Sequence, residues 1–256
     1  GVGASVLADS LVHADTDVSA LSGEPVDVFW DYDMKRSTAL HAGILIKPSE
    51  RFRIGAAFRS ALFHHLVAYS TTRVNILGVV TEYRVRIDAV NWYSPMQAAL
   101  GAVYETAAFS WAADVTWYNW SDYPGYYNKV EILEAPGSGL MTGAQAPDPR
   151  FKDTVTPRVG MEWRIAEQWA LRLGYAFNMT PAPLPSRRYD VLDCDRHTIT
   201  VGAGAEVGSE SWPLGIDFAL QVHLLQRRRV LRSVEPRELV FGGAVIDAGL
   251  TLMYRF

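Results

Sequence analysis

The stretch Phe241–Phe256, which reads FGGAVIDAGLTLMYRF, carries the pattern that decides the fold. One alternate row of this stretch is apolar: Ile246, Ala248, Leu250, Leu252, Tyr254 and Phe256. The other row mixes polar, charged and small residues: Val245, Asp247, Gly249, Thr251, Met253 and Arg255. Because successive side chains of a strand point to opposite faces, this pattern predicts a strand with one apolar and one mixed face.

The same alternation recurs along the chain and predicts ten strands. They span residues 1–13, 40–47, 52–70, 83–104, 109–118, 155–164, 169–178, 198–206, 214–224 and 241–256. Short connections are expected near residues 48–50, 105–107, 166–168 and 208–212. Long connections are expected near residues 16–36, 70–80, 122–153, 179–195 and 227–240, so short and long connections alternate.

The fourth predicted strand changes the phase of its apolar row. Odd positions are apolar from Tyr83 to Ala89, and even positions are apolar from Ala98 to Tyr104. A one-residue bulge shifts the face in this way, and proline is tolerated at a bulge. The alternative is a turn at Pro95 that makes two strands, but such a turn would upset the up-and-down order. We therefore expect one bulged strand.

Composition limits the class of protein. The 256 residues suffice for one domain, and a net charge of −4 gives no reason to expect a nucleic-acid partner. No run of 18 apolar residues occurs, which excludes a transmembrane helix. Mean hydropathy near zero is compatible with a transmembrane barrel, whose lipid-facing and lumen-facing residues cancel. The single Cys194 cannot form an internal disulfide.

The alternation of short and long connections favours an antiparallel transmembrane β-barrel. Outer-membrane barrels have short periplasmic turns and long extracellular loops. The mixed rows carry single charges among glycine, alanine and threonine, as expected of a wet and crowded lumen. The alternative is a soluble all-β sandwich, whose outward face would instead be the polar one.

Several stretches resemble the outer-membrane long-chain fatty-acid and hydrocarbon transporter family of the FadL/TodX type. The similar stretches are FKDTVTPRVGMEWRIAEQWALRLGYAFNMTPAPLP and LDCDRHTITVGAGAEV within residues 151–207, KPSERFRIGAAFRS after residue 46, and DVTWYNWSDY after residue 113. The resemblance covers about residues 39–256. The terminal Phe256 also resembles the last residue of bacterial outer-membrane barrels, which places the C-terminus at the periplasmic side.

The resemblance implies a barrel of fourteen strands with an N-terminal hatch that plugs the lumen. The sequence predicts ten strands and no hatch. We therefore expect residues 1–256 to form a single barrel domain, the C-terminal part, with four strands and the hatch upstream or in another chain. A ten-stranded barrel that closes on itself is the alternative.

The function implied by the resemblance is passive uptake of long-chain fatty acids or hydrocarbons across a bacterial outer membrane. Such uptake needs no enzymatic chemistry and no cofactor or metal. The expected partners are membrane lipids, lipopolysaccharide and the hydrophobic ligand, and an upstream fragment or other envelope proteins are further candidates. The alternative function is a structural or adaptor barrel that anchors a larger envelope complex.

Family members take up ligands in an apolar groove among extracellular loops, and the matching stretches here are residues 16–36 and about 60–80. The second stretch supplies the candidate ligand-binding residues Leu62, Phe63, Leu66, Ile76 and Leu77. Arg84, Arg158 and Arg172 are candidates for holding a ligand carboxylate by bidentate contacts. The alternative for the apolar residues is an extension of strands above the membrane. The alternative for the arginines is ion pairing across the lumen, where we also expect Arg53, Arg59, Arg86, Asp88, Asp114, Glu162, Asp217 and His223.

Other candidate sites receive weak support from spacing. Asp195 and His197 share a strand face, but no Ser–His pair accompanies them, so catalysis is not expected. His64 and His65 point to opposite faces as strand neighbours, which argues against a metal site. The run Arg227–Arg229 is expected in a solvated loop, and contact with lipopolysaccharide phosphates is the alternative to solvation alone.

Overall fold

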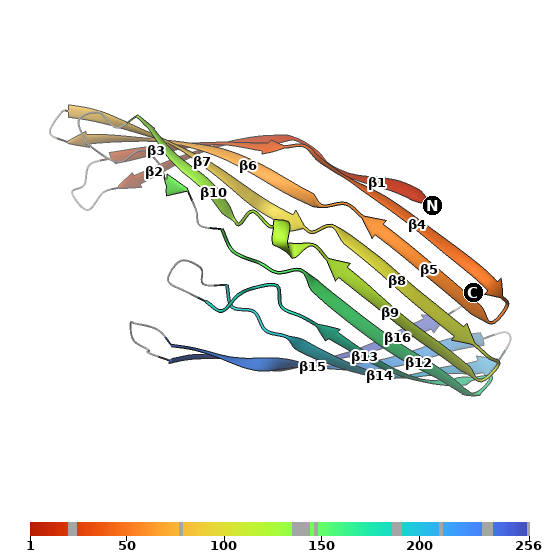
Figure 1. Ribbon diagram of the computed structural model, residues 1–256. Coiled ribbons are helices and arrows are strands. Elements are labelled where there is room, and N and C mark those ends of the chain that lie inside the picture. Colours follow the sequence, from red (N-terminus) through yellow and green to blue (C-terminus); the bar gives the residue numbers. More distant parts are fainter. Residues whose placement is uncertain are drawn as a thin grey trace.

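The computed structural model describes residues 1–19, 25–76, 79–134, 144–145, 148–185, 191–209, 212–231 and 238–254. These residues form two antiparallel sheets and one short 3-10 helix, η1 (Trp120–Asp122). Among them, no helix has the length and apolar character needed to cross a membrane. Figure 1 shows the larger sheet as a curved wall, with the smaller sheet extending from one end of it.

The larger sheet has ten strands, the number that the sequence predicts. In spatial order they are β1 (Val2–Leu7), β4 (Ser37–Ser49), β5 (Phe52–Arg59), β8 (Gln97–Glu105), β9 (Phe109–Tyr118), β12 (Thr154–Ala166), β13 (Trp169–Asn178), β14 (Arg196–Ser209), β15 (Trp212–Leu231) and β16 (Glu238–Tyr254). The connections β4–β5, β8–β9, β12–β13 and β14–β15 are short and lie at the same end of the wall (Figure 1). Within the described part of the chain, the outer edges of β1 and β16 have no strand partner.

Register places the apolar rows of all these strands side by side. One row across the wall consists of Ile54, Ala102, Ala113, Val159, Tyr175, Ile199, Val222 and Ile246. The next row lies on the opposite face and consists of Arg53, Val103, Ala112, Gly160, Gly174, Thr200, Gln221 and Asp247. The wall therefore has one apolar face and one face of small, polar and charged residues.

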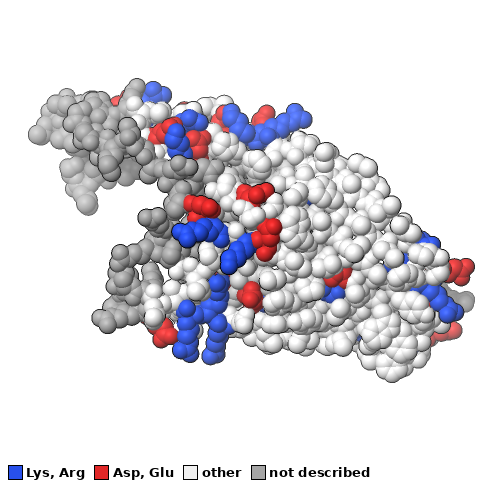
Figure 2. Space-filling view, in the orientation of Figure 1, with Lys and Arg blue, Asp and Glu red and all other residues white. Residues whose placement is uncertain are grey.

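The apolar face is exposed rather than packed into a core. Trp111, Leu173, Phe218 and Leu252 are 51%, 51%, 45% and 64% exposed, and no large side chain among the described residues is fully buried. In water these side chains would form the core, whereas hydrocarbon accommodates them on the outside. Figure 2 shows a broad band of this face that is almost free of charge, with acidic and basic residues gathered beyond both of its sides. The predicted apolar exterior is confirmed.

The smaller sheet has six strands and lies at the end opposite the short turns (Figure 1). In spatial order they are β11 (Ala144–Gln145), β10 (Tyr127–Glu134), β7 (Val79–Ser94), β6 (Leu62–Ile76), β3 (Pro25–Lys35) and β2 (Ser10–Ser19). The chain enters it from β5 through Ser60 and Ala61, and it returns to β8 through Pro95 and Met96. The smaller sheet thus continues the wall beyond the apolar band.

Several predicted boundaries are wrong because polar stretches form strands. Residues 16–19 belong to β2 and residues 25–35 to β3, while residues 70–76 belong to β6 and residues 79–80 to β7. Residues 122–153 include β10 and β11, and β15 and β16 extend into residues 227–240. The single strand expected at residues 1–13 is divided between β1 and β2. In β3 and β10 charged residues alternate with apolar ones, which suits a strand that meets water on one face.

The predicted bulge is present, but the strand around it is not continuous. Opposite β6, the pairing shifts between Val90 and Trp92, so Asn91 is the extra residue that changes the phase. The strand then stops at Pro95, which lacks a backbone N–H for pairing. Residues 83–104 therefore belong to β7 and β8 in different sheets, and residues 52–70 are divided in the same way between β5 and β6. The chain does not reverse at Pro95, so the expected up-and-down order holds.

Candidate functional site

A pocket lies where the two sheets meet, and we call it the mouth pocket. Its volume is 390 Å³, within the range of small-molecule sites. It is lined by Arg59, Trp92, Tyr93, Ser94, Pro95, Gln97, Tyr118, Trp120, Thr154, Thr156, Asn178, Met179 and Pro181. Aromatic rings, two prolines and a methionine therefore surround a small number of polar groups.

Aromatic contacts hold one side of the mouth pocket in place. The ring centroid of Tyr93 lies 5.9 Å from that of Trp120 and 5.1 Å from that of Tyr123. Tyr123 in turn stands 4.9 Å from Phe151. The carboxylate of Asp153 accepts a hydrogen bond from the backbone N–H of Ser121 at 3.0 Å, which anchors η1 beneath these rings. Burial raises the pKa of the Tyr93 phenol, so this hydroxyl stays neutral.

Small residues extend the mouth pocket along the polar face of the wall. It shares Arg59, Gln97 and Tyr118 with a second cavity of 630 Å³. The second cavity is lined by small residues of β4, β5 and β8: Gly43, Ala57 and Ala99, which are partners in register. The same three residues line a third cavity, which adds Gly55 and Gly101. We call this continuous space the lumenal passage.

Gly101 avoids a tight side-chain contact in the lumenal passage. A Cβ at Gly101 would lie 3.0 Å from the Cβ of Asp114 on β9. That distance is closer than side-chain carbons normally approach, so a larger residue would displace Asp114. The glycines and alanines of β4, β5 and β8 leave this part of the passage open.

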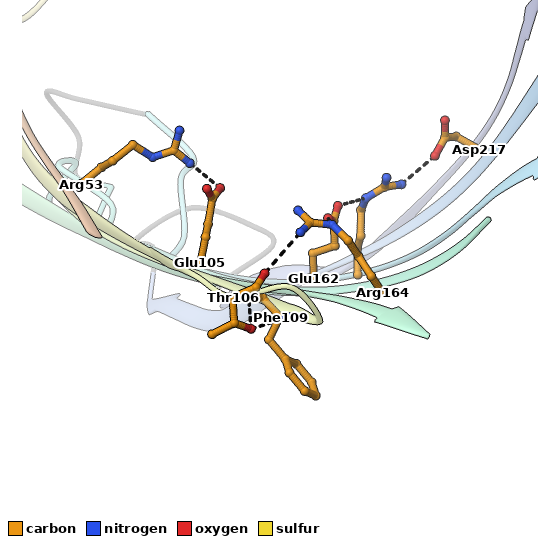
Figure 3. A network of polar contacts seen from close by, with 8 residues as sticks. Arg53, Glu105, Thr106, Phe109, Glu162, Arg164 and Asp217 are labelled. Atoms are coloured by element: carbon orange, nitrogen blue, oxygen red, sulfur yellow. Dashed lines mark hydrogen bonds and ion pairs between the residues drawn. The ribbon is translucent and has the colours of Figure 1, made fainter. Parts of the chain in front are cut away.

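A network of ion pairs crosses the polar face near the short turns. The Nε of Arg172 lies 2.9 Å from Oε2 of Glu162, and its Nη1 lies 2.6 Å from Oδ1 of Asp217. Between them the side chain passes over Gly202 and Gly204 on β14. Figure 3 shows Glu162, Arg164 and Asp217 on the inner face of the curved wall, together with the paired Arg53 and Glu105, and Phe109 on the opposite face.

The charges that the sequence assigns to the lumen separate into two groups. One group lies on the wall: Arg53, Arg59, Asp114, Arg158, Glu162, Arg172, Asp217 and His223. Arg158 pairs with Asp114 at 2.7 Å, and its Nη2 donates to Thr116 at 2.8 Å. The other group, Arg84, Arg86 and Asp88, lies on β7 in the smaller sheet. Arg86 pairs there with Asp88 at 3.1 Å and with Glu131 at 3.3 Å.

The structure does not bring the eight predicted ligand-binding residues together. Leu62 is buried, Leu66 is half-buried and Phe63 is exposed, all on β6. Phe63 is the register partner of Tyr93, which places it beside the mouth pocket. Leu77 and the side chain of Ile76 lie outside the described residues.

The predicted arginines are more widely spread. Arg158 lines the second cavity, whereas Arg172 lines a separate cavity at the short-turn end of the wall. Arg84 is exposed on the smaller sheet. Of these three arginines, only Arg158 lines a cavity that belongs to the lumenal passage.

Sequence reasoning did not select the aromatic residues of the mouth pocket. They come from two Trp-Tyr pairs, Trp92-Tyr93 and Trp117-Tyr118, and from Trp120. Each pair stands within three residues of the point where its strand ends in the structure. The sequence signal that could have indicated this pocket is the cluster of aromatic residues at predicted strand ends far from the short turns.

Three of the residues weighed for catalysis or metal binding, Asp195, His197 and His65, have other partners. Asp195 accepts a hydrogen bond from the backbone N–H of Thr180 at 2.8 Å. The Nδ1 of His197 lies 2.8 Å from the hydroxyl of Tyr175. His64 and His65 are consecutive on β6, and the Nε2 of His65 lies 3.8 Å from Asp88. These contacts fix strand ends and connections.

Comparisons with known proteins agree with this architecture. Residues 31–234 match the model of the family described as outer membrane protein transport protein (OMPP1/FadL/TodX). Alkane uptake protein A of Marinobacter nauticus is 22% identical over 185 residues, which are 67% of this chain and 39% of that protein. The chain therefore spans well under half the length of this relative.

Solved structures share the fold. A Pseudomonas aeruginosa FadL homologue is 19% identical, with a TM-score of 0.58 over 99% of this chain and 63% of that one. The Ralstonia pickettii toluene transporter TbuX is also 19% identical, with a TM-score of 0.50 over 99% of this chain and 62% of that one. The CymD monoaromatic hydrocarbon channel gives a TM-score of 0.53 at 14% identity, over 98% of this chain and 68% of that one. With an apolar exterior, an ion-paired inner face and a family match over most of its length, this chain belongs to the OMPP1/FadL/TodX family of outer membrane transport proteins.

Proposed function

We propose that this protein carries hydrophobic small molecules passively across a bacterial outer membrane. The observation that supports this most directly is the continuity of the mouth pocket with the lumenal passage. An apolar compound that leaves water at the aromatic mouth gains about 0.8 kcal/mol for each buried CH₂ group. The small residues beyond it leave room for the compound to move on, and neither an enzymatic step nor a cofactor is needed.

Long-chain fatty acids or hydrocarbons are the proposed substrate class. The names of three similar proteins refer to apolar compounds: alkane uptake protein A, the toluene transporter TbuX and the CymD monoaromatic hydrocarbon channel. The walls of the mouth pocket suit such compounds, because Trp92, Tyr93 and Trp120 offer flat apolar surfaces. Arg59 lines the same pocket and could pair with the carboxylate of a fatty acid. We therefore propose Arg59 for this role in place of Arg84 and Arg172.

The proposed setting is a larger barrel in the outer membrane with the short turns and the C-terminus at the periplasmic side. Short turns at one end and a charged sheet at the other support this orientation. We further propose that residues 1–256 form one barrel domain that supplies ten strands of a wall of about fourteen. The unpaired edges of β1 and β16 among the described strands, and the greater length of the relatives, support this proposal.

Two matched variants of β8 test transport. Ala99 lines the lumenal passage, whereas its neighbour Ala98 is exposed on the apolar face. In cells that make the full-length protein, Ala99→Trp is expected to lower the uptake rate of a labelled alkane or a labelled long-chain fatty acid at least 5-fold. Ala98→Trp, at equal protein level in the outer membrane, is expected to leave uptake unchanged.

The uptake assay also separates transport from anchoring. Equal uptake by cells with the protein, by cells without it and by cells with Ala99→Trp would overturn the transport proposal and favour a structural or adaptor barrel. Uptake of the alkane but not the fatty acid would narrow the substrate class to hydrocarbons.

A further inference from the structure

The run Arg227–Arg229 lies in strand β15 and not in the expected loop, and a bulge divides it between two faces. Leu225 pairs with Gly243 and Arg228 pairs with Phe241, so Gln226 and Arg227 together face Gly242. Gly242 has a φ of +133°, and a Cβ there would lie 2.9 Å from the Cα of Arg227. Glycine is therefore needed for the bulge, and the bulge sets the directions of the arginines.

Arg228 points inward and serves the fold. Its Nη1 donates hydrogen bonds to the carbonyl oxygens of Asp193 at 2.9 Å and Ala182 at 3.2 Å. These carbonyls belong to the connection between β13 and β14, so Arg228 holds that connection against the wall. Because neighbours along a strand alternate, Arg227 and Arg229 point to the opposite, outer face.

Arg227 and Arg229 are both exposed, two residues apart on that outer face. Arg229 has a loose ion pair with Glu238 at 3.4 Å. In the part of the chain that the structure describes, Arg227 has no acidic partner. Two arginines about 7 Å apart along a strand, of which only Arg229 has an ion pair with a described carboxylate, leave an excess of positive charge.

The row just below the two arginines on the outer face contains an aromatic ring, an imidazole and a leucine. It consists of Phe177, His197 and Leu224, which are partners in register. The rings of Phe177 and His197 lie 4.8 Å apart, and His197 contacts the hydroxyl of Tyr175 at 2.8 Å. Tyrosine is one of the residues that collect at membrane–water interfaces, so with the proposed orientation we place the membrane edge near Tyr175 and this row.

Strand geometry then places the arginines at the depth of lipid headgroups. Arg227 and Arg229 follow Leu224 by three and five residues. At a rise of about 3.3 Å per residue and a tilt of about 40°, they stand roughly 8 to 13 Å farther along the membrane normal. The polar layer of a bilayer is about 5 to 8 Å thick on each side, and a flexible arginine reaches back into it.

We propose that Arg227 and Arg229 form a binding site for the lipid A phosphate of lipopolysaccharide. Guanidinium groups bind phosphate through paired N–H donors, and the acyl chains would lie on the apolar residues Leu224 and Val222 below. The proposal rests on the proposed orientation, which puts this end of the barrel in the outer leaflet. Lipid A binding would be a second role for this protein, separate from transport through the lumenal passage.

Binding of purified lipid A to the full-length protein in detergent micelles tests this site. Native mass spectrometry or a titration followed by tryptophan fluorescence would compare wild type with R227Q/R229Q. The double variant is expected to bind lipid A with two phosphates at least 10-fold more weakly, and raised salt is expected to weaken only the wild type. R51Q is the matched control, because Arg51 is an exposed arginine in the short β4–β5 turn at the other end of the barrel.

Three outcomes would overturn the proposal: equal lipid A affinity of wild type and R227Q/R229Q, an equal loss in R51Q, or phosphatidylglycerol binding as tight as lipid A binding. The assay uses purified protein and no transported compound, so its failure is separate from a failure of uptake. R227Q/R229Q is expected to keep normal hydrocarbon uptake, since both side chains lie outside the lumenal passage.

Discussion

The two sheets of this protein follow the same two-residue period with different chemistry on their faces. In the ten-stranded sheet, the apolar rows are exposed across a band that is almost free of charge, and charged residues lie on the inner face. In the six-stranded sheet, the row Val12, Tyr32, Ala68, Ile87 and Val130 is apolar. The opposite row is His13, Asp31, Tyr69, Arg86 and Glu131, in which charge recurs on almost every strand.

Burial follows the same division. The described residues that are buried and apolar lie mainly in the smaller sheet and at its junction, with Ala68, Ala89 and Val90 each 3% exposed. The wall has almost none, because its apolar side chains face outward. The smaller sheet therefore resembles a sheet of a water-soluble domain, and the wall resembles such a sheet turned inside out. This difference predicts which substitutions each sheet tolerates.

The largest effect is expected from a charge on the outer face of the wall. Leu220 on β15 lies in the middle of the apolar band, so Leu220→Arg should lower the free energy of unfolding by about 2–4 kcal/mol in lipid bilayers. Its neighbour Gln221 points to the inner face, where Gln221→Arg should cost no more than about 0.5 kcal/mol. Urea unfolding in vesicles measures both. Equal costs would contradict the assignment of the two faces.

A charge in the apolar row of the smaller sheet should act locally. Ala68→Asp places an unpaired carboxylate at a buried position, which should cost about 1–3 kcal/mol. Hydrogen exchange should become faster in β6 and β7 and stay unchanged in β12 and β13. Thr71→Asp, on the other face opposite Arg84, is the matched control and should change exchange little. Faster exchange in both sheets would show that they unfold together.

The wall could be predicted from sequence because hydrocarbon imposes a strict pattern. Strands at Phe109–Tyr118 and Trp169–Asn178 have the bounds that alternation predicts. A lipid-facing row tolerates no charge, so an uninterrupted apolar row distinguishes each such strand from its connections in the sequence. Register adds the part that sequence lacks, namely that the apolar rows of ten strands meet on one face.

The smaller sheet was missed because water permits charge on one face. Pro25–Lys35 alternates Val26, Val28, Trp30, Tyr32 and Met34 with mostly acidic residues, yet its acidity favoured a loop. The mouth pocket was missed for a different reason. Its residues come from β5, β7, β8, β9, η1, β12, β13 and the connection after β13, and only the fold brings these segments together.

A smaller effect is expected where an ion pair depends on a glycine. A Cβ at Gly204 would lie 2.6 Å from Oδ1 of Asp217 and 3.1 Å from Nη1 of Arg172, so Gly204→Ala should separate that pair. The expected loss is about 1 kcal/mol, because the pair is partly exposed to the lumen. Gly249, on the same face of β16, has no atom within 4 Å of an added Cβ, and Gly249→Ala should be close to neutral. Urea unfolding that gives equal values for the two variants would contradict this account.

The smallest effect concerns acid and the pairing of β10 with β7. A hydrogen bond from Lys129, and to a lesser extent the charge of Arg86, lowers the pKa of Glu131 below its ordinary value of about 4.5. A carboxylate with a lowered pKa stabilises the folded state above its ordinary pKa, and this contribution is lost as the pH falls through the lowered value. Amide protection factors in β10 should therefore decrease as the pH is taken from about 6 to about 3.

Glu131→Gln provides the control for this pH effect. The amide cannot ionise, so protection of β10 in the variant should be lower than wild type near pH 6 and should change less with acid. The charge-free outer band of the wall has no such group, and amides of β14 next to Val201 should keep their protection over the same range. A variant that loses protection with acid as steeply as wild type would assign the effect to another carboxylate, and the smaller sheet offers Asp31, Asp88 and Glu82 as the next groups to replace.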